Sequence, residues 1–152
     1  MATPFDKYAA KGNELLHLLA EDLQISNEKA FRILKAVLHV LRDHVSVNES
    51  MQIMSQLPVA VKGIYVEQWH VDATVKKLHI PHDFFNEVCR HDKGMVLQDF
   101  ENYEAVEQSV KAVFRTLNYY LSEGEFEDII AVMPVEIKKL IEDSIGKNRM
   151  VL

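Results

Sequence analysis

The sequence predicts an all-α protein of about eight helices, arranged as two four-helix halves in one compact bundle. Three observations predict this class. Apolar residues recur at three- and four-residue steps rather than in alternation. Only five glycines and four prolines occur in 152 residues, which leaves few of the turns that a β protein needs. Finally, residues 35–62 and 111–138 align without a gap and share ten identities in 28 positions.

That alignment indicates an internal duplication with an offset of 76 residues. It divides the chain into a first repeat at residues 1–76 and a second at residues 77–152. A unit of about 76 residues buries only a marginal core of its own. We therefore expect the two repeats to pack together as one structural domain.

The helices can be placed in order along the chain. A cluster of leucines between Leu15 and Leu23 indicates an opening helix from about Pro4 to Asp22. The apolar stripe of residues 30–45 predicts the second helix, and residues 106–121 repeat that stripe in the second half. Pro81 is suited to begin the first helix of the second half. Residues 69–80 then form the junction, and residues 146–152 have no helical pattern.

Two capping boxes mark further helix starts, at Ser46–Glu49 and Ser122–Glu125. The short helices that they open must end before Pro58 and Pro134, because a residue that precedes proline disfavours the α conformation. Each proline suits the first position of another helix. The sequence thus predicts helices over residues 58–68 and 134–143.

Charge and composition argue against several classes of partner. The net charge is −6, of which residues 77–152 contribute −5 (nine basic against fourteen acidic side chains). This balance disfavours nucleic acid and anionic lipid. No segment approaches the length of about 20 apolar residues that spans a bilayer, and the start shows no secretory signal. The single Cys89 fits a reducing compartment, so we expect a cytoplasmic protein.

Three histidines near Cys89 raise the question of a metal site. His79, His82 and His91 are weak candidates, because Pro81 separates the first two. Seven helical residues would also place His82 and Cys89 about 10 Å apart, too far to share one zinc ion. Solvated or junction histidines and a buried inert thiol are the favoured interpretation.

A basic strip is expected on the second helix, roughly opposite its apolar stripe. The strip could bind nucleic acid or an acidic partner, but no aromatic residue interleaves with it and the second half repeats it only in part. A solvated helix face is the favoured interpretation. The strip comprises Lys29, Arg32, Lys35, His39 and Arg42.

Tyr65 and Trp69 are the candidate partner-binding residues. They lie four positions apart, and hence on one face if the helix continues that far. Exposed aromatic side chains often anchor a partner chain. Packing against the junction and the other half is the alternative, and it is favoured over exposure. The second half has Ile141 and Ile145 at these places, so the repeated unit does not require an aromatic pair.

The same segments resemble the bacterial domain-of-unknown-function family number 2267. The resemblance rests on Ala36–Asp43 and Gln56–Trp69, and on Ala112–Phe114, Ser122–Glu125 and Met133–Pro134 in the second half. It covers roughly Asp6 to Asp143. The resemblance implies a small all-helical bacterial or archaeal protein. It brings no assigned reaction and no catalytic residues to transfer.

No phosphate-binding loop, nucleophile elbow, zinc-finger spacing or paired inward carboxylates can be found, so we expect neither an enzyme nor a bound cofactor. The leading hypothesis is a non-enzymatic module that binds protein, with a second copy of the chain as one candidate partner. The alternative is a protein that binds a small ligand or a metal in a cleft between the two halves.

Overall fold

The computed structural model describes residues 2–71, 81–91 and 99–146, without the side chains of Pro81 and His82. Within these ranges the chain forms eight helices and no strand, which confirms the all-α class. Part of the expected junction (72–80) and the tail from 147 onward lie outside the described residues. The helices are α1 (Asp6–Leu23), α2 (Asn27–Asp43), α3 (Val47–Gln56), α4 (Val59–Val66), α5 (Pro81–Arg90), α6 (Tyr103–Tyr120), α7 (Glu123–Ala131) and α8 (Val135–Ile145).

Both predicted capping boxes are present. The Ser46 hydroxyl accepts from the Glu49 N–H at 3.1 Å, and the Glu49 carboxylate accepts from the Ser46 N–H at 2.7 Å. Ser122 and Glu125 make the same reciprocal pair at 3.2 and 2.9 Å. These bonds use N–H groups that have no partner within the helix, and so they fix where α3 and α7 begin.

The prolines are displaced by one position from the expectation. Pro58 and Pro134 are extended residues just before α4 and α8, rather than the first helical residues. The end of α4 also differs, since this helix stops at Val66 instead of residue 68. Gln68 has a left-handed backbone conformation (φ 59°), which reverses the chain so that Trp69 folds back.

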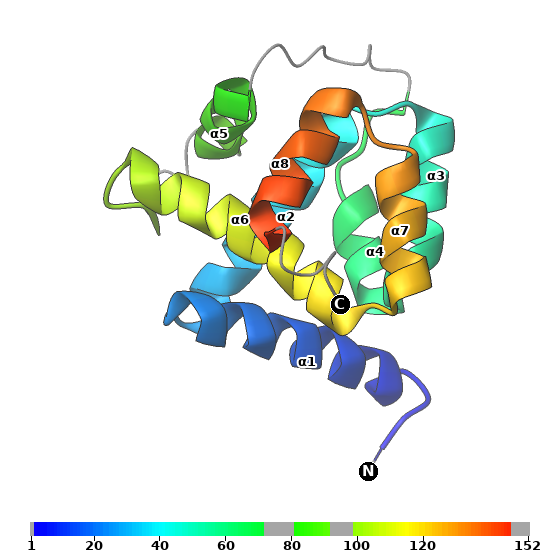
Figure 1. The fold of residues 1–152 in the computed structure, drawn as a ribbon. Coiled ribbons are helices and arrows are strands. Elements are labelled where there is room, and N and C mark those ends of the chain that lie inside the picture. Colours follow the sequence, from blue (N-terminus) through cyan, green and yellow to red (C-terminus); the bar gives the residue numbers. More distant parts are fainter. Residues whose placement is uncertain (1, 72–80, 92–98, 147–152) are drawn as a thin grey trace.

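The helix starts recur at the predicted interval: α2 and α6, α3 and α7, and α4 and α8 each begin 76 residues apart. The packing has the same regularity. The first helix of each half contacts the second helix of the other half, α1 on α6 and α5 on α2. In addition α3 packs against α7, and α2 against α6 (Figure 1). The two halves therefore interleave around a common core.

The two second helices, α2 and α6, form the centre of that core. Helix α2 contacts α1, α4, α5 and α6, and its residues from Ala36 to Arg42 are all buried. Large buried side chains from the surrounding helices close the core, among them Leu15, Phe84, Phe126 and Ile137. Among the described residues, no helix is both long enough and apolar enough to cross a bilayer.

Candidate functional site

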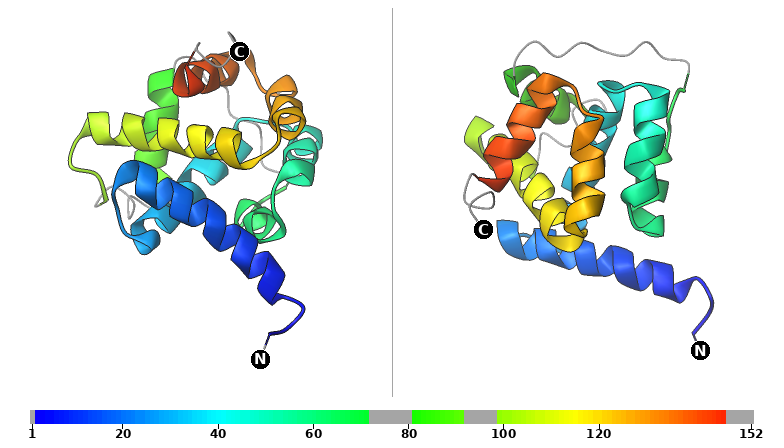
Figure 2. Two further views of the ribbon diagram at one scale, coloured as in Figure 1. Left: turned by 60° about the horizontal axis from the view of Figure 1, so that its bottom comes forward. Right: turned by 45° about the vertical axis from the view of Figure 1, so that its right-hand side comes forward.

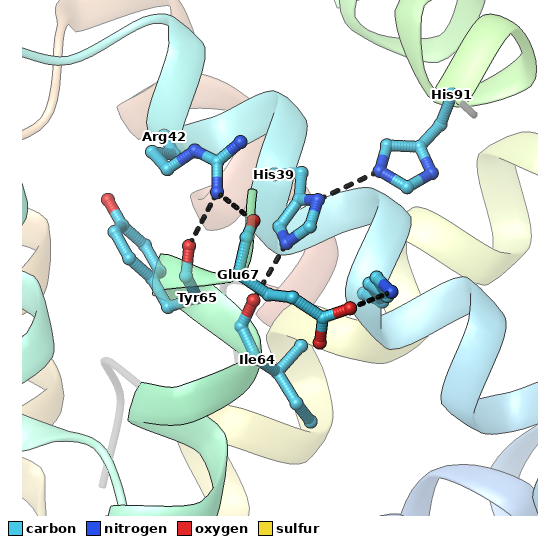
Figure 3. A network of polar contacts seen from close by, with 7 residues as sticks. His39, Arg42, Ile64, Tyr65, Glu67 and His91 are labelled. Carbon is cyan, nitrogen blue, oxygen red and sulfur yellow. Dashed lines mark hydrogen bonds and ion pairs between the residues drawn. The ribbon is translucent and has the colours of Figure 1, made fainter. Parts of the chain in front are cut away.

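The candidate site is a buried polar network formed by α2 and the end of α4 from the first half and by the end of α5 from the second half (Figure 3). Helix α2 places His39 and Arg42 almost one turn apart, both at most 8% exposed. Helix α4 ends beside them and presents the backbone carbonyls of Ile64, Tyr65 and Glu67. His91, directly after α5, reaches His39 from the other side.

The two imidazoles are joined by a hydrogen bond whose direction can be deduced. His39 Nε2 lies 2.7 Å from the Ile64 carbonyl oxygen, which can only accept, so this nitrogen carries the proton. In the neutral ring His39 Nδ1 is then the acceptor. It lies 2.9 Å from His91 Nε2, which therefore donates. The pair links the first half of the chain to the end of α5.

Burial lowers the pKa of His39 from 6.5 to about 4. Removal from water disfavours the charged ring, and the nearby Arg42, His91 and Lys35 oppose a further positive charge. The hydrogen bond to the Ile64 carbonyl acts in the other direction. His39 is thus neutral at pH 7, and serves as a structural donor and acceptor.

Arg42 holds the end of α4. One guanidinium nitrogen, Nη1, donates to the carbonyls of Tyr65 at 2.8 Å and Glu67 at 2.9 Å. A cation at this place also complements the negative end of the helix dipole. Its Cζ lies 5.9 Å from the centre of the Trp69 ring, within the range of a cation–π contact. Burial lowers the pKa of Arg42.

Tyr65 is fully buried, which corrects the exposed-anchor interpretation for this side chain. Its hydroxyl is 2.7 Å from that of Ser50, and burial raises the pKa of Tyr65 to about 12. Its ring meets Trp69 edge-on at 6.1 Å between centroids. Trp69 is only partly buried and lies at the rim, so partner binding by Trp69 stays a prediction.

The predicted solvated strip on α2 is wrong for two of its five residues, because His39 and Arg42 are buried. The strip was expected to face water, but α4 and α5 pack against α2 there. Lys35 binds Glu67 at 2.6 Å, and Arg32 makes two bonds to Asp99 at 2.7 and 2.8 Å. The Lys35–Glu67 pair lies at the edge of the network, because the Glu67 carbonyl also accepts from Arg42.

The candidate metal ligands are placed only in part. His79 and the side chain of His82 lie outside the described residues, while His91 faces His39. Within the described ranges, no group of three or more histidine, cysteine or acidic side chains could hold a metal ion. Cys89 is half-buried, and burial raises the pKa of its thiol, which makes it less reactive.

The second half has different residues at most positions of this network. An offset of 76 residues places Arg115 and Asn118 at the positions of His39 and Arg42, and Phe126 and Ile141 at those of Ser50 and Tyr65. Arg115 and Asn118 instead line a broad cavity of about 940 Å³, which lies between α1 and the ends of α6 and α8. Arg115 and Asp22 form an ion pair at 3.3 Å within its lining.

Sequence comparison places the chain in a family without an assigned function. No curated protein matches the sequence. Residues 12–140 match the family described as "Uncharacterized conserved protein (DUF2267)", which includes all of α2, α4 and α5. Since the match covers most of the 152 residues, the chain belongs to the DUF2267 family.

Proposed function

We propose that this protein is a non-enzymatic helical module that binds other proteins through its first half. One observation carries the proposal. Four apolar side chains of α2, α3 and α4 are between 39% and 57% exposed, and each lies 76 residues before a glutamate of the second half. The pairs are Phe31 with Glu107, Val47 with Glu123, Met51 with Glu127, and Val66 with Glu142.

Isolated exposed apolar residues are common and carry little meaning by themselves. Here the second half shows that the same scaffold positions accept a charged side chain. The fold therefore does not require an apolar residue at these four places, and contact with a partner is a reason to keep one. Val59 and Val135 provide a contrast, since both halves expose valine at that position.

The buried network supports this function by fixing the end of α4. Arg42 binds the carbonyls of Tyr65 and Glu67 on either side of Val66, whose side chain is exposed. Trp69 lies next to Arg42 and packs on Tyr65. Val66 and Trp69 are thus held in place before any partner arrives, and such preorganisation reduces the entropic cost of binding.

Three further expectations belong to the proposal. Catalysis is not expected from the network, because Arg42 Nη1 and His39 Nε2 donate to backbone carbonyls and His91 Nε2 donates to His39. Nucleic acid is not the expected partner, since Arg32, Lys35 and Arg42 of α2 bind Asp99, Glu67 and backbone carbonyls, respectively. A cytoplasmic location is inferred from the single cysteine.

The test compares proteins captured by the immobilised wild-type chain and by the double variant Val47→Glu/Met51→Glu. These changes copy Glu123 and Glu127, and glutamate is favourable in the first turns of a helix, so folding should be unaffected. Val135→Glu is the matched control in the second half. We expect partners that the wild type and the control retain and the double variant loses. Identical captured sets for all three chains would contradict the proposal.

A small-ligand protein remains the second candidate, favoured by the cavity of about 940 Å³. This cavity lies between helices of the two halves, as a binding cleft between them would, and its lining includes both apolar and charged side chains. Thermal denaturation against a panel of metabolites and divalent ions would test it. A stabilisation that Arg115→Leu abolishes would support this candidate, and a flat response across the panel would remove it.

A further inference from the structure

A smaller, apolar cavity opens in the first half between α1, α2 and α4. Its volume is about 240 Å³. Helix α1 contributes Ala9, Gly12, Asn13 and Leu16, and apart from Asn13 every lining residue is apolar or glycine. Since an apolar cavity of about 150 Å³ can hold benzene, this one has room for a phenyl ring.

Small residues on α1 create the cavity. Ala9 and Gly12 have little or no side chain to fill the space, and α1 and α4 approach closely at Gly12. A Cβ atom added there would lie 2.9 Å from that of Ala60 on α4. Alanine at position 12 would therefore push α1 and α4 apart, so glycine keeps the α1 wall of the cavity in place.

In the second half the positions equivalent to Ala9 and Gly12 hold larger side chains. Phe85 stands at the position of Ala9 and Val88 at that of Gly12, and both side chains are buried. The Phe85 ring packs edge-on against Tyr103 of α6 at 5.8 Å. The first half thus has two very small residues where the second half has a buried aromatic and a buried aliphatic side chain.

An exposed ring lies about one helical turn before the cavity, next to the start of α1. Phe5, directly before α1, is 77% exposed. Phe5, Ala9, Gly12 and Leu16 follow one another at steps of four, three and four residues, which places them along one face. Both views of Figure 2 show the start of α1 projecting beyond the other helices.

We propose that Phe5 of one copy enters this cavity in a second copy, and that the second copy's Phe5 enters the first. Ala9, Gly12, Asn13 and Leu16 are spaced i, i+3, i+4 and i+7, the arrangement of a hole that receives a knob from a facing helix. A knob and a hole on the same face of α1 make that face complementary to itself. A two-fold axis beside Ala9 would place Phe5 of each copy in the cavity of the other. The inference deepens the proposed function by naming one partner.

Polar groups on α1 match the same arrangement. Asp6 and Asn13 are seven residues apart, and hence lie on the same flank of the stripe. The Asp6 carboxylate already accepts from the N–H and the hydroxyl of Thr3 in its own chain, at 2.7 and 3.1 Å. The two-fold axis would place the other copy's Asn13 amide beside it as a further donor. This pairing favours a second copy over an unrelated apolar ligand.

The area available predicts a weak dimer. Each buried phenylalanine removes roughly 150–250 Å² of its surface from water, so two rings account for at most about 500 Å². A stable interface usually buries at least about 1,200 Å² in total. We therefore expect self-association only at high concentration, with a dissociation constant not far below about 1 mM.

The experiment is a complementation test by sedimentation up to about 1 mM, with each variant first checked for helical content. Phe5→Ala removes the ring, and Ala9→Phe adds a ring on the α1 wall of the cavity, at the position where the second half has Phe85. Each variant alone should associate at least about tenfold more weakly than the wild type. An equal mixture of the two should associate more strongly than either alone, because one ring and one cavity remain compatible.

Tyr119→Ala is the control, since it removes another highly exposed ring far along the sequence and should leave association unchanged. Ala9→Leu replaces Ala9→Phe if the larger side chain prevents folding. A monomeric wild type at about 1 mM, unaltered association of Phe5→Ala, or a mixture no stronger than its parts would each overturn the inference. The proposed function is tested separately, because Val47→Glu/Met51→Glu leaves Phe5 and the cavity intact.

Discussion

Between α2 and α4 the first half buries a charged and polar network, whereas the second half has aliphatic or uncharged residues at most of the equivalent positions. Arg42 corresponds to Asn118, Tyr65 to Ile141 and Ser50 to Phe126. The second, third and fourth helices of the two halves nevertheless begin at the same interval of 76 residues. The helical scaffold therefore does not require the buried polar network.

This contrast matters because a buried polar network is seldom the most stable choice. Apolar side chains of similar volume often stabilise a core equally well or better. The second half shows that such a replacement suits this fold. What the network adds is a fixed end of α4, where Val66 is exposed and Trp69 folds back on Tyr65. The first half thus has a prepared surface.

The largest effect is expected from Arg42→Met. The variant leaves the carbonyls of Tyr65 and Glu67 without their donor and removes the contact with Trp69. Chemical denaturation should show a loss of about 3 kcal/mol in the free energy of unfolding. The matched change in the second half, Asn118→Leu, should cost less than about 1 kcal/mol, because Asn118 Oδ1 has no hydrogen-bond partner among the described residues. Equal losses of unfolding free energy in the two variants would show that Arg42 stabilises the first half no more than Asn118 stabilises the second.

Acidification should destabilise the protein through His39. Its pKa is lower in the folded state (about 4) than in the unfolded chain (6.5), so between these values the unfolded chain binds more protons. The contribution is fully present above pH 6.5 and is lost as the pH falls towards 4. Its full size is about 3 kcal/mol. Unfolding free energies measured from pH 7.5 to 4.5 should fall more steeply for the wild type than for His39→Asn.

A smaller effect is expected at the Tyr65–Ser50 hydrogen bond. Tyr65→Phe and Ser50→Ala each leave one buried hydroxyl unpaired and should each cost about 1–2 kcal/mol. The double variant should cost less than the sum by about 1 kcal/mol, since it removes both hydroxyls together. Strict additivity in this double-mutant cycle would mean that the bond contributes nothing.

The smallest difference between the halves is expected at the capping boxes, which both halves contain. Ser46→Ala and Ser122→Ala each remove the hydroxyl of a capping box. Each should cost about 1 kcal/mol, and the two losses should agree within about 0.5 kcal/mol. A large disparity between them, seen in parallel thermal melts, would show that the two caps do not contribute equally.

The scaffold could be predicted from the sequence because its signals are local. A capping box spans four residues, and proline restricts only its neighbours. Ser46, Ser122 and Pro81 therefore placed helix starts to within a residue or two. The end of α4 was predicted less well, because the sequence 63–69 contains no stop signal and the chain reversal occurs at Gln68.

The network could not be predicted because it depends on tertiary packing. A helix with one apolar stripe is ordinarily assumed to expose its opposite face. Helix α2 contacts α4 and α5 as well as α1 and α6, so His39 and Arg42 have no face left to water. Their partners lie 23 to 52 residues away in the chain. No sequence pattern signals that the carbonyl of Ile64 will meet an imidazole.

The claim that the first half contains a closed, dehydrated network can be tested most directly by an NMR titration of the His39 imidazole. We predict the tautomer protonated at Nε2, a hydrogen bond from that nitrogen to the Ile64 carbonyl, and a pKa of about 4. Titration near 6.5 with rapid exchange between the two tautomers would contradict the account.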